Sequence, residues 1–375
     1  MAAHPEKKAG TMKVAVVGTG VAGASTAFAL ATTGADVTVI DSDHAGQATA
    51  AGAGIIQPWS SSATGPYYDL YAAGAAYYPS VIERLGAAGV TDVGYRRSGS
   101  IVVDADPGQL DDVEKRLRER PANVPLAGEI ERLDAAQARE LFPPLAPNLQ
   151  AVLVPGGARV DGRRLRAGLL EAAQRNGART IQGEARVEMR GGNPALYVGA
   201  DPVAADSIVV AAGAWTNHVI APLGVQVPVE PQRGQITHLE VRDAETKDWP
   251  SVLPVASHYL VAFDGGRIAV GATRETGSGF DPRVTAAGQR QVLDDALRVA
   301  PGLAGATVLE TRVGLRPLAD APIVGALSEH PTVYVNTGFG AAGLTMGPLV
   351  GHLLAQLILG DRPDVDLARF APSDQ

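Results

Sequence analysis

The stretch Lys13-Val-Ala-Val-Val-Gly-Thr-Gly-Val-Ala-Gly23 decides the fold of this chain. The apolar, largely β-branched run that ends at Val17 is typical of a strand buried on both faces of a parallel sheet. Three glycines follow at the spacing of a phosphate-binding turn. Gly18 permits the tight turn, Gly20 lets the backbone approach a pyrophosphate, and Gly23 lets the next helix pack closely on the strand. The stretch therefore predicts a strand, a phosphate turn and the start of a helix.

A second strand with an acidic end completes this unit. Residues 22–33 are rich in alanine and predict a helix that Gly34 ends, and residues 36–40 predict the next strand. Asp41 follows that strand, about 20 residues after the glycines, where a carboxylate can accept hydrogen bonds from ribose hydroxyls. An acidic residue here disfavours a 2′-phosphate and so argues against NADP. A glycine turn without a ligand is the alternative, which Asp41 disfavours, while FAD and NAD both remain open.

The rest of the chain combines two patterns. Residues 206–212 and 332–336 have the continuous apolar pattern of buried strands, and a Gly-rich loop and a helix to about Leu359 follow the second. Between residues 227 and 271 apolar and polar positions alternate, as in antiparallel strands. We therefore expect an α/β fold in which a Rossmann-like nucleotide-binding domain carries an inserted antiparallel-sheet substrate domain.

The expected nucleotide-binding domain is discontinuous, because its strand patterns lie far apart in the chain. It comprises residues 12–90, 150–225 and 310–370, and the substrate domain comprises residues 91–149 and 226–309. Residues 1–11 are small and polar and predict a disordered leader.

Composition narrows the class of protein. The 375 residues are 46% hydrophobic and 19% charged, enough for a full core in each of two domains. A net charge of -8 without a basic cluster argues against nucleic acid as a partner. The chain has no cysteine, so it has no disulfide, no thiolate metal site and no flavin held through a thioether, and its seven histidines show no metal-ligand spacing.

The sequence predicts no membrane segment. No apolar run reaches the roughly 18 residues that span a bilayer without Gly, Pro or charge. The basic and apolar amino end has some features of a secretory signal, but Gly18, Gly20 and Gly23 interrupt the apolar run. A cytoplasmic protein is expected.

Five segments in a fixed order carry a family resemblance. They are the amino-terminal unit with Asp41; Thr49-Ala-Ala-Gly-Ala-Gly-Ile-Ile56; Ile208-Val-Val-Ala-Ala-Gly-Ala-Trp215; Gly314-Leu-Arg-Pro317 with Asp320 and Pro322-Ile-Val-Gly325; and Thr337-Gly-Phe-Gly-Ala-Ala-Gly-Leu-Thr-Met-Gly-Pro348. With them the sequence resembles the FAD-dependent D-amino-acid oxidase family over nearly its whole length. This family includes glycine oxidases, sarcosine oxidases and D-amino-acid dehydrogenases.

The resemblance implies a non-covalent FAD. Residues 49–56 have almost no side-chain bulk, which suits backbone lying against a flat ring, although a tightly packed helix is the alternative. The last Gly-rich loop leads into a helix whose first amides can point at a flavin carbonyl. By resemblance Val187 would meet the adenine through its main chain. The cofactor-binding residues so expected are Gly18, Gly20, Val21, Ala22, Gly23, Asp41, Ser42, Thr49, Ala50, Gly54, Ile55, Ile56, Val187, Gly213, Gly338, Phe339, Gly340, Ala342, Gly343, Leu344 and Thr345.

The resemblance also suggests which residues hold a substrate. Arg316 stands where the family places the arginine that grips the substrate carboxylate with two parallel hydrogen bonds. Tyr259 resembles the tyrosine that helps to seat that carboxylate, with a core tyrosine as the alternative. Arg274 matches a position that in glycine oxidases faces the pocket with an apolar side chain. A charge there would change which side chains the pocket admits, unless Glu275 neutralises it or it turns to solvent. Ala341 replaces the second arginine of glycine oxidases, which puts glycine itself in doubt as the substrate.

Other residues near these motifs receive weaker assignments. Gln57 and Trp59 follow the expected flavin segment and are candidates for the pocket border. His258 should point away from Tyr259, because successive side chains of a strand alternate between faces, and so has an expected structural role. Three tyrosines at helical spacing, Tyr67, Tyr71 and Tyr78, are expected in the core.

The function expected from the resemblance is oxidation of the carbon–nitrogen bond of an amino acid. A hydride would pass to the flavin, and water would hydrolyse the resulting imine to a keto acid and ammonia, or to an amine fragment for an N-alkyl substrate. A D-amino acid, glycine or an N-alkyl amino acid remains open as the substrate, and oxygen or a quinone or other electron carrier as the acceptor. The oligomeric state, including a homo-oligomer, is also open. An NAD-dependent dehydrogenase and a non-catalytic flavin-binding module are the competing interpretations.

Overall fold

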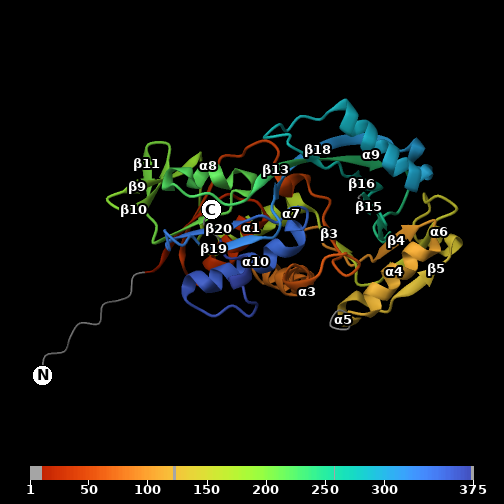
Figure 1. The fold of residues 1–375 in the computed structure, drawn as a ribbon, viewed down its shortest axis with the longest axis horizontal. Helices are drawn as coiled ribbons and strands as arrows, with labels where there is room; N and C mark the ends of the chain where they lie inside the picture. Colours follow the sequence, from red (N-terminus) through yellow and green to blue (C-terminus); the bar gives the residue numbers. More distant parts are fainter. Residues whose placement is uncertain (1–10, 121–123, 257, 373–375) are drawn as a thin grey trace, which may run out of the picture.

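The computed structural model describes residues 11–120, 124–256 and 258–372, and Figure 1 shows the chain as a long molecule built around two sheets. The predicted leader, residues 1–11, lies outside the described residues except for its last position. An α/β fold with a parallel and an antiparallel sheet confirms the predicted fold class.

A six-stranded sheet forms the nucleotide-binding half. Its order is β19-β20-β12-β1-β2-β8, and every neighbouring pair is parallel except β19 with β20. The predicted βαβ unit supplies its centre, because the Gly-rich turn leads directly from β1 into α1 (Val21–Ala31). The strands are β1 (Lys13–Val17), β2 (Asp36–Asp41), β8 (Arg179–Gln182), β12 (Ser207–Val210), β19 (Ile323–Ala326) and β20 (Val333–Thr337).

This sheet is the middle of three layers. Side chains of β1 alternate between the two faces of the sheet. Val14 and Val16 pack among the helices on one face, and Ala15 and Val17 lie in the core on the other face. The helical face carries α1 (Val21–Ala31), α3 (Gly65–Ala87), α7 (Gly162–Arg175) and α10 (Gly343–Leu359). The other face carries α8 (Thr216–Ile220) and the small antiparallel sheet of β9 (Ala185–Arg190), β10 (Asn193–Val198) and β11 (Asp201–Val203).

A nine-stranded, mostly antiparallel sheet forms the other half. The alternating pattern of residues 227–271 forms β13 (Glu230–Glu240), β14 (Ser251–Pro254), β15 (Tyr259–Ala262) and β16 (Arg267–Gly271), of which β13, β16 and β15 are neighbours and each is antiparallel to the next. The strands are β4 (Ser100–Asp104), β5 (Glu131–Leu133), β6 (Gln150–Val154), β13 (Glu230–Glu240), β14 (Ser251–Pro254), β15 (Tyr259–Ala262), β16 (Arg267–Gly271), β17 (Glu275–Thr276) and β18 (Thr307–Leu318). Its helices are α4 (Pro107–Arg118), α5 (Val124–Ala127), α6 (Ala135–Leu141) and α9 (Ala286–Val299).

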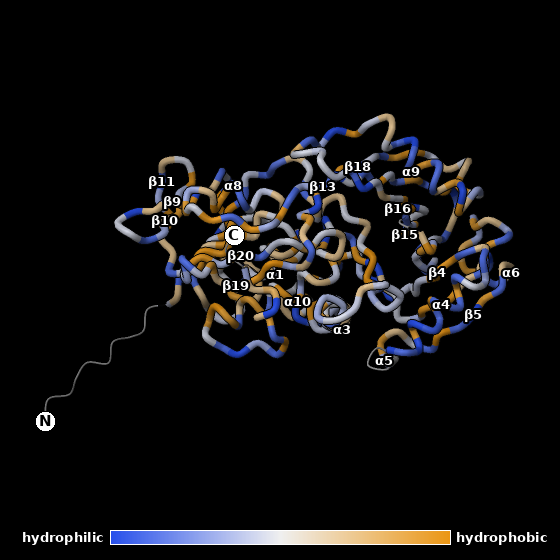
Figure 2. The backbone as a smooth tube through the Cα atoms, viewed as in Figure 1, coloured by the Kyte–Doolittle hydropathy of each residue, from blue (hydrophilic) through white to orange (hydrophobic). Residues whose placement is uncertain are grey.

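Short elements join the two halves. They are α2 (Ala48–Ala51), β3 (Ile55–Ile56) and β7 (Ala158–Arg159), and β3 pairs with β7. Figure 2 shows the hydrophobic residues concentrated around β20 and α1, and hydrophilic residues on the outer loops. The domain boundaries stay a prediction; β6 and β18 pair within the nine-stranded sheet, although residues 150–154 and most of residues 307–318 fall in segments that the sequence assigned to the nucleotide domain.

Candidate active site

A cavity of about 940 Å³ lies where the two sheets meet. The ends of β1, β2 and β20 reach it through Val17, Asp41 and Thr337, and the loop after β12 reaches it through residues 211–215. Ligands of open parallel sheets bind outside the carboxyl ends of the strands, so this is the expected edge for a nucleotide. The opposite wall comes from β13, β15 and β18 of the antiparallel sheet. Ligand pockets commonly measure roughly 300–1,000 Å³, so the cavity has room for a large ligand.

The three glycines of the turn differ in what they do. Gly18 has a φ of 100°, and a Cβ there would lie 2.4 Å from the carbonyl oxygen of Ala211. A Cβ on Gly23 would lie 2.0 Å from the carbonyl oxygen of Gly18, so this residue must be glycine for α1 to pack on the turn. A Cβ on Gly20 would meet only the hydroxyl of Thr49, at 3.4 Å. The fold therefore requires Gly18 and Gly23, whereas Gly20 keeps space open at the cavity.

Asp41 both borders the cavity and fixes the turn. Its carboxylate accepts hydrogen bonds from the backbone N–H and the hydroxyl of Thr19, the former at 2.6 Å, and from the backbone N–H of Asp43 at 2.6 Å. The hydroxyl of Thr49 accepts a hydrogen bond of 2.9 Å from the N–H of Val21 in the first turn of α1. Arg166 on α7 donates to the carbonyl oxygen of Thr19 at 2.9 Å. The turn is thus held in one conformation by side chains from three other elements.

The small-residue segment borders the cavity, and neighbouring backbone leaves no room for a side chain at Gly54. A Cβ on Gly54, whose φ is 80°, would lie 1.8 Å from the carbonyl oxygen of Val160. Thr345 on α10 donates to the carbonyl oxygen of Ile55 at 3.1 Å, and Tyr78 on α3 donates to that of Leu344 at 2.5 Å. The first bond ties the segment to the start of α10, and the second ties α10 to α3. Gly343 and Leu344, the first residues of α10, line the cavity, and a flavin contact of their amides stays a prediction.

The predicted cofactor residues divide into two groups by their place in the structure. Those that line the cavity are Gly18, Gly20, Val21, Ala22, Asp41, Ser42, Thr49, Gly54, Ile55, Gly213, Phe339, Gly340, Gly343 and Leu344. Those that do not line it are Gly23, Ala50, Ile56, Val187, Gly338, Ala342 and Thr345. The cavity reaches β9 only at Ala185 and its preceding loop, and Val187 is fully buried, so the adenine contact of its main chain stays a prediction.

Arg316 lies on β18 at the wall that faces the cofactor segments. Its Nη1 donates to the carbonyl oxygen of Thr273 at 3.0 Å and to the side-chain oxygen of Gln232 at 3.4 Å. Burial lowers the pKa of Arg316, and the neighbouring Tyr259 hydroxyl, which is hydrogen-bonded to it, opposes that change. Burial likewise raises the pKa of Tyr259, against the charges of Arg316 and Arg274. Arg316 and Tyr259 therefore form a half-buried pair that lines the cavity.

Arg274 also lines the cavity, with an exposed side chain. Among the described residues it makes no hydrogen bond and no ion pair, and its charge lowers the pKa of Arg316. Glu275 does not neutralise it, because that carboxylate is bound elsewhere. It accepts from Arg233 at 2.6 Å, and from Gln235 and the hydroxyl of Thr273 at 2.7 Å each. Burial alone would raise the pKa of Glu275, but these hydrogen bonds bring it below its ordinary value.

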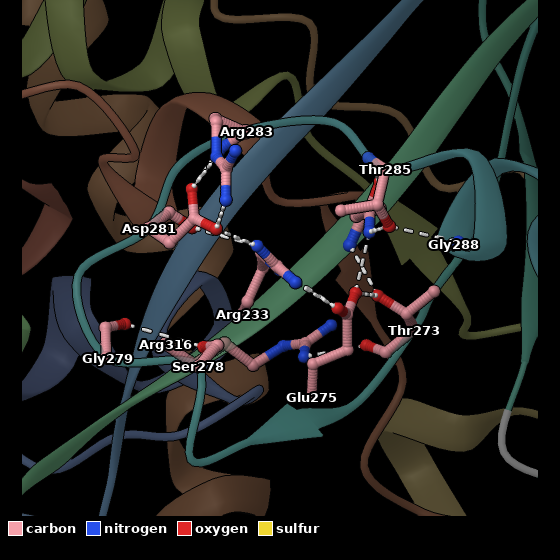
Figure 3. A network of polar contacts seen from close by, with 11 residues as sticks. Arg233, Thr273, Glu275, Ser278, Gly279, Asp281, Arg283, Thr285, Gly288 and Arg316 are labelled. Carbon is pink, nitrogen blue, oxygen red and sulfur yellow. Dashed lines mark hydrogen bonds and ion pairs between the residues drawn. The ribbon is translucent and has the colours of Figure 1, made fainter.

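Arg233 is the centre of this network. Figure 3 shows its guanidinium between Glu275 on one side and Asp281 on the other, with Arg316 close beneath. The ion pair with Asp281 measures 2.7 Å and anchors the loop of residues 277–285. That loop carries Phe280 to the cavity, where its ring lies 5.5 Å from the ring of Trp215.

Sequence reasoning missed several residues at the cavity. Tyr71 borders it, although helical spacing predicted a core position, since periodicity identifies an inward face without saying whether core or cavity lies there. His44 and Phe280 line it from loops on the two halves, and Arg116 lines it while donating to the carbonyl oxygen of Ser60 at 2.8 Å. Gln57 lies at the cavity as the sequence suggested, whereas the Trp59 side chain belongs to the hydrophobic core.

Two other features of the described chain bear on function. Across residues 11–120, 124–256 and 258–372, no helix is both long enough and apolar enough to cross a bilayer. Over the same residues, no three His, Cys, Asp or Glu side chains come together as a group that could hold a metal ion.

The residues at the cavity fit FAD. The open space at Gly20 beside the start of α1 suits a pyrophosphate, and the carboxylate of Asp41 suits a ribose. The segment at Gly52 and Gly54, where neighbouring atoms leave no room for a side chain, borders the cavity with backbone and suits a planar ring.

Comparison with known proteins agrees with this fit. The family described as FAD dependent oxidoreductase, DAO, matches residues 13–357. The crystal structure of iminodiacetate oxidase from Chelativorans sp. BNC1 superposes with a TM-score of 0.94 at 46% identity, covering 96% of this chain and 98% of that one. The oxidoreductase YurR of Bacillus subtilis is 45% identical, over 96% of this chain and 98% of its own length. Glycine oxidase of Pseudomonas putida is 30% identical, over 96% of this chain and 98% of its own length. The predicted resemblance is confirmed: the chain belongs to the DAO family of FAD-dependent oxidoreductases.

Proposed function

We propose that this enzyme oxidises the carbon–nitrogen bond of an N-alkyl amino acid that carries two carboxylates, of the iminodiacetate kind. The observation that carries the proposal is a pair of arginines on one wall of the cavity. Arg316 is half-buried beside Tyr259, and Arg274 also lines this wall without a carboxylate partner among the described residues. Two guanidinium groups at one site suit a substrate with two carboxylates.

The partners of the Glu275 carboxylate support the assignment of Arg274 to a second substrate carboxylate. A carboxylate next to Arg274 in sequence would cancel its charge if the two were paired. Arg233, Gln235 and Thr273 instead occupy both oxygens of Glu275. The cation of Arg274 is therefore available to a ligand. Ala341, which also lines the cavity, stands where glycine oxidases have their second arginine and offers no charge. The 46% identical relative is an iminodiacetate oxidase, and iminodiacetate is a secondary amine with a carboxylate at each end.

The reaction follows from this binding mode. FAD, when bound, accepts the hydride from the carbon beside the nitrogen. Arg316 and Tyr259 would hold the carboxylate on the reacting carbon, and Arg274 the distant one, so that the substrate has one orientation. The neutral secondary amine loses a hydride and becomes an iminium ion. Water then adds to the carbon–nitrogen double bond, and cleavage gives an aldehyde acid and a primary ammonium, which from iminodiacetate are glyoxylate and glycine. Oxygen, a quinone or another electron carrier reoxidises the flavin.

A substrate series tests the proposal. The rate of anaerobic flavin reduction is measured against concentration for iminodiacetate, N-methylglycine, glycine and D-alanine. We expect iminodiacetate to have the highest ratio of limiting rate to half-saturating concentration. Arg274→Met should lower that ratio roughly 10- to 100-fold for iminodiacetate and less than about threefold for N-methylglycine, because only the former has a second carboxylate.

An exposed arginine serves as the matched control. Arg290 lies on α9 away from the cavity, and Arg290→Met should leave both substrates unchanged. A wild-type enzyme that reduces its flavin faster with glycine or D-alanine than with iminodiacetate would overturn the proposal in favour of a simple amino-acid oxidase, as the Pseudomonas putida relative is for glycine. An equal loss for both N-alkyl substrates in Arg274→Met would show that Arg274 does not bind the second carboxylate.

A further inference from the structure

Gly234 lies directly against the guanidinium of Arg316. In the antiparallel pair of β13 and β18, Arg316 is opposite Gln232, and Gly234 is two positions further along β13. A Cβ on Gly234 would lie 2.4 Å from Nη2 of Arg316 and 2.5 Å from both Cζ and Nη1. The flat end of the arginine therefore lies across the Cα atom of Gly234, in space that a methyl group would fill. We call this space the Gly234 notch.

The backbone does not explain why glycine stands here. Gly234 does not have a positive φ, so its extended conformation is open to any residue. Glycine within a strand weakens it and often marks a place where another group approaches closely. The three heavy atoms nearest to a Cβ placed on Gly234 all belong to Arg316, and none to the backbone of a neighbouring strand. The notch thus serves the arginine and not the sheet.

Gly314, the direct partner of Gly234 on β18, provides an internal contrast. A Cβ on Gly314 would lie 2.9 Å from Cβ of Ala51 and 3.2 Å from Cα of Ala48, both in α2, which leads into the segment that fits the cofactor. Gly314 lets α2 pack on the sheet. One glycine pair therefore makes room for α2 on one strand and for the arginine on the other.

We propose that Gly234 is a positioning residue that sets the orientation of Arg316 toward the substrate carboxylate. With the guanidinium lying in the notch, Nη1 is directed to the carbonyl oxygen of Thr273 and to Gln232. The rest of the guanidinium is left to Tyr259 and to the cavity. This proposal rests on the proposed function only in taking Arg316 as the group that binds the carboxylate. A methyl group at Gly234 would push the flexible end of Arg316 out of the notch and away from Thr273.

The test is a double-mutant cycle with Gly234→Ala and Arg316→Ala. Anaerobic flavin reduction is measured against concentration for the amino acid that reduces the wild-type enzyme fastest and for its amine analogue that lacks the carboxylate. Gly234→Ala should raise the half-saturating concentration of the amino acid roughly 10- to 100-fold and leave the amine almost unchanged. In the Arg316→Ala background the same change should have less than about a twofold effect, because the notch then has no occupant.

Controls separate this positioning role from a general effect on the fold. FAD content and apoprotein melting temperature of Gly234→Ala should stay close to wild type, since only a flexible side-chain end must move. Gly305→Ala, at a glycine with nothing within 4 Å of the added Cβ and no positive φ, should match wild type in every assay.

Each contrary result has a distinct meaning. The positioning role would be overturned if Gly234→Ala had wild-type kinetics, or if it had the same effect with and without Arg316. The proposed function would survive this result as long as Arg316→Ala still lost selectivity for the carboxylate. If Arg316→Ala slowed the amino acid and the amine by the same factor, Arg316 would not bind the carboxylate. The proposed function and the role of Gly234 would then fall together.

Discussion

The space at Gly20 leads to the sharpest prediction for cofactor binding. Gly20→Val should abolish retention of FAD while leaving the apoprotein folded, because the added side chain would occupy the open space at the start of α1. The new Cβ meets only the hydroxyl of Thr49 at 3.4 Å, and the change replaces the N-cap glycine of α1, so the free energy of unfolding should fall by roughly 1 kcal/mol.

The expected loss of affinity follows from what the pyrophosphate would give up. An anion at a helix N-terminus gains up to about 2 kcal/mol from the helix dipole, and each charge-assisted hydrogen bond contributes roughly 1.5–3 kcal/mol. Losing the dipole contact and one such bond costs about 3 to 5 kcal/mol, or roughly a 100- to 5,000-fold higher dissociation constant for FAD.

The assay is titration of apoprotein with FAD, followed by quenching of flavin fluorescence, alongside thermal unfolding of each apoprotein. Gly23→Val is the matched control, because its Cβ would lie 2.0 Å from the carbonyl oxygen of Gly18 and should unfold or strongly destabilise the domain. A folded Gly20→Val protein that binds FAD as tightly as wild type would refute the assignment of this turn to the pyrophosphate.

Other predictions concern the substrate wall and a buried histidine. Arg316→Ala should cost roughly 2 to 4 kcal/mol of transition-state stabilisation, which is about 30- to 1,000-fold in the efficiency of flavin reduction. Arg316→Lys should fall between Arg316→Ala and wild type, because a lysine keeps the charge without the two-pronged geometry. Equal slowing of an amine that lacks the carboxylate would count against this role of Arg316. His238 is 1% exposed, and burial, with the charges of Arg312 and Arg267, lowers its pKa from 6.5 to about 4. The unfolded state therefore binds more protons between these values, so the free energy of unfolding should decrease as the pH falls through this window, by at most about 3 kcal/mol. Chemical denaturation at pH 4.5 and 6.5 should give a smaller difference for His238→Gln, and an unchanged difference would show that another group controls this pH dependence.

The nucleotide-binding half was predictable because its signals are local. The strand, the glycine spacing and the acid at Asp41 lie within about 30 residues, and each follows from a rule about adjacent residues. Boundaries shifted by a residue or two, as at α1, which runs from Val21 to Ala31 rather than from Ala22 to Thr33. Helix termini fray, so such shifts are ordinary.

The substrate wall was predictable only in part, because it depends on strand register. Arg316 stood out through its motif, but its contact with Gly234 requires the pairing of two strands about 80 residues apart. No local sequence pattern predicts the register of β13 with β18. The role of Glu275 had the same limitation: its neighbour in sequence is Arg274, whereas its ion-pair partner in space is Arg233.

The order of strands in the parallel sheet has a consequence for biosynthesis. β12 lies between β1 and β20, and β20 comprises residues 333–337 of a chain of 375. A ribosome releases the amino-terminal strands first, so β12 must wait for its last neighbour until nearly the whole polypeptide has been made. Such long-range parallel pairing is slow to form and leaves a hydrophobic strand edge open in the meantime. We therefore expect that chains terminated before residue 333 aggregate instead of folding, and that expression yield depends on chaperones that shield this edge until translation ends.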